Sequence, residues 1–238
     1  MPRVSVLIPL HNCESTLRRS LDSVYSQDYN DFEVVAVLNN CTDRTESILD
    51  DYKGHSQTLK ILQCDIPGIV PTLNTGIQHC EGELIARQDG DDLWYPEKLK
   101  KQVEFLDKNP DIDIVGTQMR QVDGTGMPIS ASLVHPTTDV EIKGKLLSGN
   151  NSIVHPTVVF RKRILLRAGT YDGHYRFAED YHFWLKCCKW YHFANLDEVL
   201  LDYTVWHNEE YDPSIVHHVR NIMQYLYQNT GFEHGAKK

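Results

Sequence analysis

The sequence predicts an α/β fold, in which a mainly parallel sheet is flanked by helices and joined by a smaller mixed sheet and a C-terminal helix. Strand-like and helical segments alternate through the first half of the chain. The second half has less regular strands, and the 238 residues, 41% of them hydrophobic, can bury one substantial core. We therefore expect a single domain over residues 1–238.

The first two strands and helices show the alternation most clearly. Residues 3–9 form a β-branched, apolar run, and apolar side chains then recur with helical spacing over 17–25. The same order returns with a strand over 32–38 and a following helix. Asp43 can cap that helix, with Glu46 at its third position.

The next elements continue this pattern. A strand over 59–62, a helix over 72–79 and a strand over 83–87 follow in order, and a further helix starts near Pro96. Strands that alternate with helices favour a parallel sheet covered on both faces.

The second half predicts the smaller mixed sheet. Residues 112–122 and 128–134 read as strands on either side of a hairpin turn at 123–126. Further strands are predicted over 157–161 and 199–206. Apolar residues over 215–226 then recur with helical spacing, which predicts an amphipathic C-terminal helix.

Composition excludes some partners and indicates a compartment. The net charge of -9 and the pI near 5.7 leave no general basic field for nucleic acid or an anionic membrane. No apolar run is long enough to cross a bilayer, and the six cysteines lack the spacing of a zinc site or a disulfide frame. We expect a cytoplasmic protein with reduced thiols and no transmembrane segment.

An acidic turn follows the fourth predicted strand. Asp89, Gly90, Asp91 and Asp92 lie where open parallel sheets bind ligands, beyond the carboxyl end of a strand. Gly90 can adopt a positive φ, which would turn Asp89 and Asp91 toward one point. Two such carboxylates suit Mg²⁺ or Mn²⁺, which also takes oxygen from a substrate phosphate. A solvated acidic turn whose last aspartate caps the next helix is the alternative.

A second acidic pair stands at the start of a predicted helix. Glu179 and Asp180 precede a segment with a large apolar face, where the helix dipole favours negative charge. An ionised aspartate in a cleft can accept the proton of an attacking hydroxyl, although a simple helix cap is the alternative. His155 and His207 are candidates for a phosphate or metal contact.

Taken together, these segments resemble family 2 glycosyltransferases of the GT-A fold. The resemblance runs in order over roughly the first two hundred residues. It is carried by residues 4–9 (VSVLIP) with Asn12, 39–43 (NNCTD), 73–77 (LNTGI), 85–92 (IARQDGDD), 155–157 (HPT), 169–172 (GTYD), and 178–181 (AEDY) with Trp184.

The resemblance implies a role for each matching site residue. Residues 1–110 would bind a nucleotide-sugar, 111–206 would hold the acceptor and catalytic groups, and 207–238 would be helical. Asp91, with Asp89, matches the metal-binding motif, and Asp180 matches the catalytic base. The remaining matches fall near the nucleotide: Pro9, His11, Glu14 and Asn39 at the base, and Arg87, Asp89 and Gly90 near the ribose and diphosphate.

The implied reaction transfers a sugar from a nucleotide-sugar, with UDP-sugars the first candidates, to an acceptor hydroxyl with inversion. The family often has an aromatic residue at the position of His11 and an aspartate at that of Asn39, so guanine and thymine donors stay open. The acceptor, whether glycan, lipid-linked molecule or protein, and oligomerisation stay open too.

Two other functions fit the same predicted fold, and the sequence favours each of them less. A sugar-phosphate nucleotidyltransferase would need a glycine-rich phosphate loop after the first strand, and residues 10–14 contain no glycine. A catalytically idle nucleotide-sugar-binding scaffold would keep the fold, and the presence of both Asp91 and Asp180 speaks against it.

Overall fold

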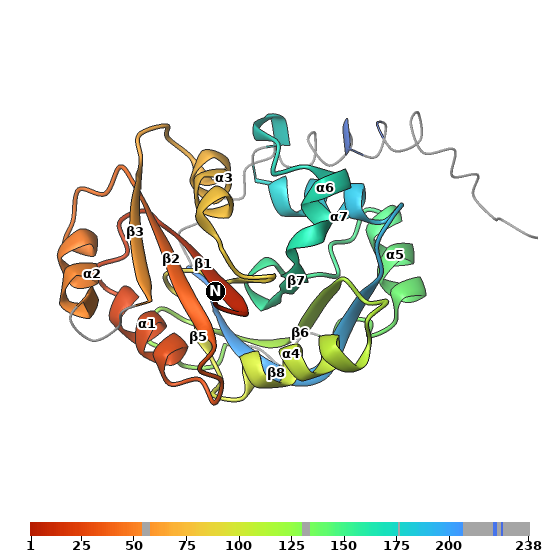
Figure 1. Cartoon of the computed structure of the whole chain (residues 1–238), viewed down its shortest axis with the longest axis horizontal. Coiled ribbons are helices and arrows are strands. Elements are labelled where there is room, and N and C mark those ends of the chain that lie inside the picture. The colour runs from red at the N-terminus through yellow and green to blue at the C-terminus, as the bar shows by residue number, and fades with distance from the viewer. Residues whose placement is uncertain (54–57, 130–133, 176, 207–220, 223–224, 226–238) are drawn as a thin grey trace, which may run out of the picture.

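One curled sheet runs through the molecule (Figure 1). The structure is a computed structural model, which describes residues 1–53, 58–129, 134–175, 177–206, 221–222 and 225. Within this part of the chain, the sheet has eight strands in the order β3-β2-β1-β4-β7-β6-β8-β5. Their bounds are β1 Val4–Leu10, β2 Phe32–Asn39, β3 Leu59–Cys64, β4 Leu84–Arg87, β5 Leu93–Trp94, β6 Ile114–Val122, β7 Val159–Arg161 and β8 Phe193–Thr204.

Strand direction separates the two halves of this sheet. β3, β2, β1 and β4 are parallel to one another, as the alternating pattern predicts. β7 then runs antiparallel to β4 and β6, β6 and β8 are parallel, and β5 is antiparallel to β8. The predicted α/β fold is confirmed, and the mixed strands extend the main sheet because β7 pairs with the free edge of β4.

Helices cover both faces of the sheet. α1, α2 and α4 bury their apolar residues against one face, and α3, α5, α6 and α7 bury theirs against the other. Their bounds are α1 Leu17–Tyr25, α2 Thr45–Lys53, α3 Ile69–His79, α4 Lys98–Lys108, α5 Asp139–Leu147, α6 Leu165–Ala168 and α7 Glu179–Cys187, with 3₁₀ turns at η1 His155–Thr157, η2 Lys162–Ile164 and η3 Gly173–Tyr175.

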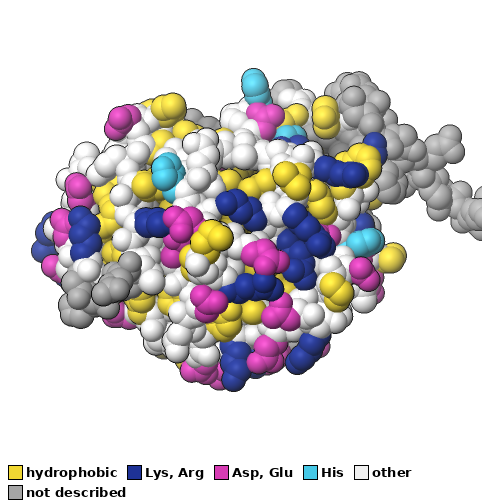
Figure 2. Space-filling view, viewed as in Figure 1, with side chains coloured by type: hydrophobic (Ala, Val, Ile, Leu, Met, Phe, Trp, Pro, Cys, Tyr) yellow, Lys and Arg dark blue, Asp and Glu magenta, His cyan; other side chains and the backbone are white. Residues whose placement is uncertain are grey.

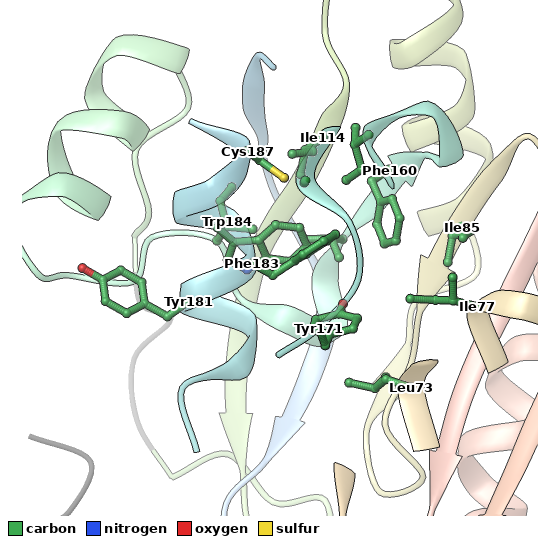
Figure 3. Close-up of a cluster of buried hydrophobic side chains, with 14 of the residues drawn as sticks. Leu73, Ile77, Ile85, Ile114, Phe160, Tyr171, Tyr181, Phe183, Trp184 and Cys187 are labelled. Atoms are coloured by element: carbon green, nitrogen blue, oxygen red, sulfur yellow. The ribbon is translucent and has the colours of Figure 1, made fainter. Parts of the chain in front are cut away.

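Continuous apolar strands explain this two-sided cover. Every residue of β1 and β2 is buried, and in β1 the side chains of Val6 and Ile8 join one core while that of Leu7 joins the other. The second core contains a group of aromatic rings (Figure 3). In that group, the ring centroids of Tyr171 and Phe183 lie 4.6 Å apart.

One predicted element is shortened in the structure, and one short strand was not predicted. The hairpin turn after β6 is present, but in the described residues its second strand is reduced to a single bridge between Val122 and Pro128. Pro128 has no backbone N–H to extend the ladder, and the Asp123 carboxylate takes the N–H groups of Thr125 and Met127 instead. The two-residue strand β5 was not predicted, because so short a segment carries no periodicity.

The C-terminal helix lies mostly outside the described residues. Of that segment, Ile222 is buried in the core beside α7 and Tyr225 is exposed. Of the helices that the structure describes, none is both long and apolar enough to cross a membrane.

Charges of both signs share the visible surface, and the cysteines are unpaired. Lys and Arg side chains are mixed with Asp and Glu side chains on the face in Figure 2, rather than gathered into a basic field. All six cysteines are free.

Candidate active site

The site is built where the strand order changes direction. β1 lies between β2 and β4, because the chain runs from β1 through β2 to β3 on one side and then crosses to β4 on the other side of β1. This creates a crevice at the carboxyl ends of the parallel strands, where such sheets bind ligands. His11 follows β1, Asn39 ends β2 and Asp89 follows β4. Residues far apart in the sequence thus meet at one edge.

A cavity of about 540 Å³ opens at the ends of β1 and β2. Three of the residues predicted to border the nucleotide base lie in its wall, which is formed by Pro9, Leu10, His11, Asn39, Asn40, Pro67, Gly68, Ile69 and Thr72. Glu14 is not among these lining residues. Its carboxylate instead accepts a hydrogen bond from the backbone N–H of Arg44 at 3.1 Å, which ties the loops after β1 and β2 together.

The side chain of Asn39 is occupied within the protein. Its Nδ2 donates to the carbonyl oxygens of Cys64 and Ile66, both at 2.8 Å, and its Oδ1 accepts from the N–H of Gly68 at 2.9 Å. Both amide hydrogens are therefore used to hold the loop that forms one wall of the cavity. Pairing of Asn39 with a uracil edge would break these bonds, which the sequence alone did not reveal.

The acidic turn brings three carboxylates together. One oxygen from each of Asp89, Asp91 and Asp92 lies within 4.8 Å of the others. The expected role of Gly90 needs correction, since it is not among the described glycines with positive φ. A Cβ at Gly90 would instead lie 2.6 Å from Leu10 Cδ2, so the turn packs closely on the end of β1 and a larger residue would force neighbouring side chains to move.

Asp92 contradicts the alternative of a solvated turn that caps the next helix. Its side chain is buried, its Oδ1 accepts from the N–H of Thr204 in β8 at 2.8 Å, and its Oδ2 has no hydrogen-bond partner in the described chain. Burial, followed by the charges of Asp89 and Asp91, raises its pKa well above the usual range. A divalent cation fits here, because it would relieve the repulsion and satisfy the free oxygen.

Arg87 links the acidic turn to the other acidic pair. Its buried guanidinium forms an ion pair with Asp89. Burial alone would lower the pKa of Arg87, but the Asp89 carboxylate raises it above its usual value. The same positive charge acts on Glu179 and Asp180. Both acidic groups therefore share one electrostatic environment centred on Arg87.

Asp180 stands at the start of α7, as predicted, and is half-buried. Its Oδ1 accepts from the N–H of Tyr181 at 2.6 Å, and its Oδ2 accepts from Asn151 Nδ2 at 2.9 Å. Burial raises its pKa, while these two bonds and Arg87 oppose the shift. Burial, then the neighbouring Asp180, raises the pKa of Glu179 to about 7. Glu179 can therefore take up a proton near neutral pH.

The two candidate histidines differ in placement. His155 is buried, its Nε2 lies 2.8 Å from the Tyr171 hydroxyl, and burial followed by the Arg87 charge lowers its pKa well below the usual value. The structure therefore gives His155 a neutral, packed position near Arg87, and its contact with phosphate or metal stays a prediction. His207 lies outside the described residues.

Sequence reasoning missed three residues of this region. Asn151 holds the carboxylate of Asp180, Asp92 adds the third carboxylate of the turn, and Trp206 Nε1 donates to Asp91 Oδ2 at 2.8 Å. Asp92 was visible as part of the acidic run. The other two residues carry no local signal, because their partners lie 29 and 115 positions away.

Comparisons with known proteins identify the family of the chain. The profile of "Glycosyl transferase family 2" matches residues 5–168. The O-antigen biosynthesis glycosyltransferase WbnJ of Escherichia coli is 31% identical over 211 residues, which cover 87% of this chain and 80% of that protein.

Two solved structures share the fold. The structure of S. aureus TarS in complex with UDP has a TM-score of 0.75 and 25% identity, over 97% of this chain and 67% of that one. The mannosyltransferase PcManGT from Pyrobaculum calidifontis, in complex with GDP-Man and Mn²⁺, has a TM-score of 0.66 and 22% identity, over 87% and 58%. The chain therefore belongs to glycosyl transferase family 2 and is a glycosyltransferase of the GT-A fold.

Proposed function

We propose that this glycosyltransferase moves a sugar from a nucleotide-sugar, with a UDP-sugar as the first candidate, to an acceptor hydroxyl with inversion at the anomeric carbon. Mn²⁺ or Mg²⁺ assists the reaction. One observation carries the proposal: at the edge of the sheet where parallel strands bind ligands, the three carboxylates of the acidic turn lie together, Arg87 forms an ion pair with Asp89, and the charge of Arg87 also acts on Asp180.

The donor is assigned to the cavity beside the acidic turn. Pro9, His11 and Asn39 line the cavity, and Arg87, Asp89 and Gly90 follow toward the ribose and diphosphate. The fold relatives were solved with UDP in one case and GDP-Man in another, which supports a nucleotide-sugar without selecting the base. Because Asn39 is occupied, we assign base recognition to backbone groups and the other side chains of the wall.

Asp89 and Asp91 are assigned to the divalent cation, with Asp92 behind them. When bound, such an ion neutralises the charge that develops on a departing diphosphate. The protein supplies a fixed cluster of oxygen atoms, and Arg87 limits the repulsion between them through its ion pair with Asp89. This arrangement is a candidate for the metal motif of the family.

Asp180 is assigned as the general base. It would accept the proton of the acceptor hydroxyl while that oxygen forms a bond to the anomeric carbon. The bond between that carbon and the diphosphate oxygen breaks at the same time, and its electron pair leaves with the diphosphate. One displacement from the opposite face inverts the configuration. Asn151 supports this role by fixing the Asp180 carboxylate.

The acceptor is proposed to be a growing glycan. The relative WbnJ is named for O-antigen biosynthesis, which supports a role in polysaccharide or glycoconjugate assembly. We assign acceptor choice to residues 116–152 and to the C-terminal part, whose sequences are the least regular. We propose a cytoplasmic location.

A donor and metal screen tests the proposal. UDP-, GDP- and dTDP-sugars are incubated with the protein and Mn²⁺, Mg²⁺ or EDTA, and hydrolysis and thermal unfolding are recorded. We expect one class of nucleotide to raise the unfolding temperature only with a divalent ion, and NMR of a transferred product to show inverted anomeric configuration. Equal binding and turnover in EDTA, or a retained configuration, would contradict the mechanism.

A further inference from the structure

Trp206 lies just beyond β8 and reaches the acidic turn. Its Nε1 donates a hydrogen bond of 2.8 Å to Asp91 Oδ2, although the two residues are 115 positions apart in the sequence. The side chain of Trp206 is 40% exposed, so the contact lies at the rim of the site rather than in the core. The bond takes one of the two carboxylate oxygens that Asp91 could offer to an ion.

The backbone around this contact is held by further bonds. Thr204 donates from Oγ1 to the carbonyl oxygen of Asp91 at 2.6 Å, and its N–H donates to Asp92 Oδ1 at 2.8 Å. Arg19 donates to the carbonyl oxygen of Asp91 and to Thr204 Oγ1, each at 3.1 Å. The end of β8 is thus fixed to the acidic turn, and Trp206 starts from a defined position.

The indole ring is also positioned from its other side. A Cβ placed on Gly124, in the turn after β6, would lie 2.7 Å from a carbon of the Trp206 ring. The same guanidinium of Arg19 donates to the carbonyl oxygen of Gly124 at 3.1 Å. The Trp206 ring therefore lies directly against Gly124, and any larger residue there would push the ring away.

We propose that Trp206 is a positioning residue of the metal site: its N–H fixes the Asp91 carboxylate so that the remaining oxygen faces the ion. This inference rests on the proposed function, because it takes Asp91 as a ligand. A carboxylate with one oxygen held loses less rotational freedom when the other oxygen binds, which favours ion binding. The turn after β6 contributes through its contact with the ring.

Two variants disturb this contact by different routes. Trp206→Phe keeps an aromatic ring on Gly124 and removes the N–H. Gly124→Ala keeps the N–H and pushes the ring away from its surface. Trp190→Phe is the matched control, because Trp190 is a half-exposed tryptophan that packs between Arg167 and Lys189 instead.

Mn²⁺ binding is measured directly, with UDP present, by electron paramagnetic resonance of the free ion. We expect Trp206→Phe and Gly124→Ala each to weaken Mn²⁺ binding about fivefold, the effect of one ordinary hydrogen bond. Trp190→Phe should bind as the wild type does. In transfer assays the concentration of Mn²⁺ needed for half activity should rise by the same factor, with kcat at saturating Mn²⁺ nearly unchanged.

The results separate this inference from the proposed function. If the wild type binds Mn²⁺ and both variants bind it as tightly or more tightly, the inference fails while the proposed function stands. If the wild type itself does not bind Mn²⁺, the inference fails together with the assignment of Mn²⁺ in the proposed function. Thermal unfolding in EDTA checks that each variant folds. If one of the two does not fold, the other decides the test alone.

Discussion

Two polar regions lie at the same edge of the sheet and differ in how far their hydrogen bonds are satisfied. At the end of β2, Asn39 uses both amide hydrogens and its oxygen on the neighbouring loop. After β4, Asp89, Asp91 and Asp92 crowd together, and Asp92 keeps a buried oxygen without a partner in the described chain. The first region is complete, and the second carries more negative charge than Arg87 neutralises.

This contrast separates the residues that bind a ligand from the residues that hold the shape of the site. A polar group whose partners are all within the protein stabilises a shape, whereas crowded carboxylates are costly until a cation or a proton arrives. Arg87 supplies only part of the missing charge through its ion pair with Asp89. We therefore assign ion binding to the acidic turn and cavity shape to Asn39.

The largest expected effect comes from the acidic turn itself. Asp91→Asn removes a charged ligand, so we expect divalent-ion-dependent donor binding to be abolished and transfer to fall by at least about a hundredfold. Calorimetric titration with UDP, with and without Mn²⁺, measures the binding. Normal transfer by this variant would show that the ion binds elsewhere.

Asp180→Asn tests the base apart from the ion. We expect donor affinity to stay close to that of the wild type. The rate of transfer should fall by an amount that corresponds to the loss of about 3 kcal/mol of transition-state stabilisation. Single-turnover assays at saturating donor measure the chemical step. Asn151 can still bond to the new side chain, so its own contribution needs a companion variant. Asn151→Ala removes the hydrogen bond to Asp180 and should cause a smaller loss of transfer. A parallel loss of donor affinity in Asp180→Asn would contradict the assignment.

Asn39→Asp tests the satisfied region. The carboxylate could still accept from Gly68, but it would lose two donated bonds and face the carbonyl oxygens of Cys64 and Ile66. We expect the free energy of unfolding to fall by about 2 kcal/mol, with weaker nucleotide binding. Urea unfolding measures the change in stability, and the exposed Asn30→Asp, outside the cavity, serves as the control. Tighter uridine binding with unchanged stability would mean that residue 39 contacts the base directly.

Glu179 tests whether burying a carboxylate beside Asp180 costs stability. Its pKa is raised to about 7 from 4.5, so the folded state holds the proton more tightly and stability falls as the pH rises through that window. Glu179→Gln should remove this slope and gain about 1 to 2 kcal/mol over the wild type at pH 8. Urea unfolding in EDTA at pH 4.5, 6 and 8 measures it, with exposed Glu104→Gln as control. Parallel pH profiles would refute the assignment.

Lys98 is a buried charge away from that edge and gives the smallest effect. Its Nζ donates to Gln102 at 2.9 Å above the Trp94 ring, and burial lowers its pKa well below 10.5. The folded state binds fewer protons below pH 10.5, so stability rises with pH from the lowered pKa up to that value. Lys98→Met should remove this rise and gain about 1 kcal/mol at pH 7. Urea unfolding at pH 7 and 10 measures the stability, with exposed Lys100→Met as control. An equal change of stability with pH in both variants would contradict this role of Lys98.

The sequence predicted the parts of this molecule that depend on local pattern. Alternating apolar strands and helices gave β1 to β4, and the acidic run after β4 located the candidate metal site. The start of α7 at Glu179 was also predicted, because a helix with an apolar face begins there. Each of these signals lies within a few neighbouring residues.

Long-range contacts could not be predicted in the same way. The burial of Asp92 depends on Thr204, 112 residues later, and the occupation of Asn39 depends on the loop after β3. The sequence predicted a positive φ at Gly90, whereas in the structure its constraint is the close approach of Leu10. Such features follow from the register of strands that pair only in the folded chain.

A crystal structure with Mn²⁺ and a nucleotide-sugar, recorded at the manganese absorption edge, tests most directly whether the acidic turn binds the ion beside Asp180. We predict an anomalous peak beside Asp89 and Asp91, the nucleotide in the cavity lined by Asn39, and the Asp180 carboxylate facing the anomeric carbon. A manganese peak away from the acidic turn, or a sugar bound out of reach of Asp180, would contradict the account.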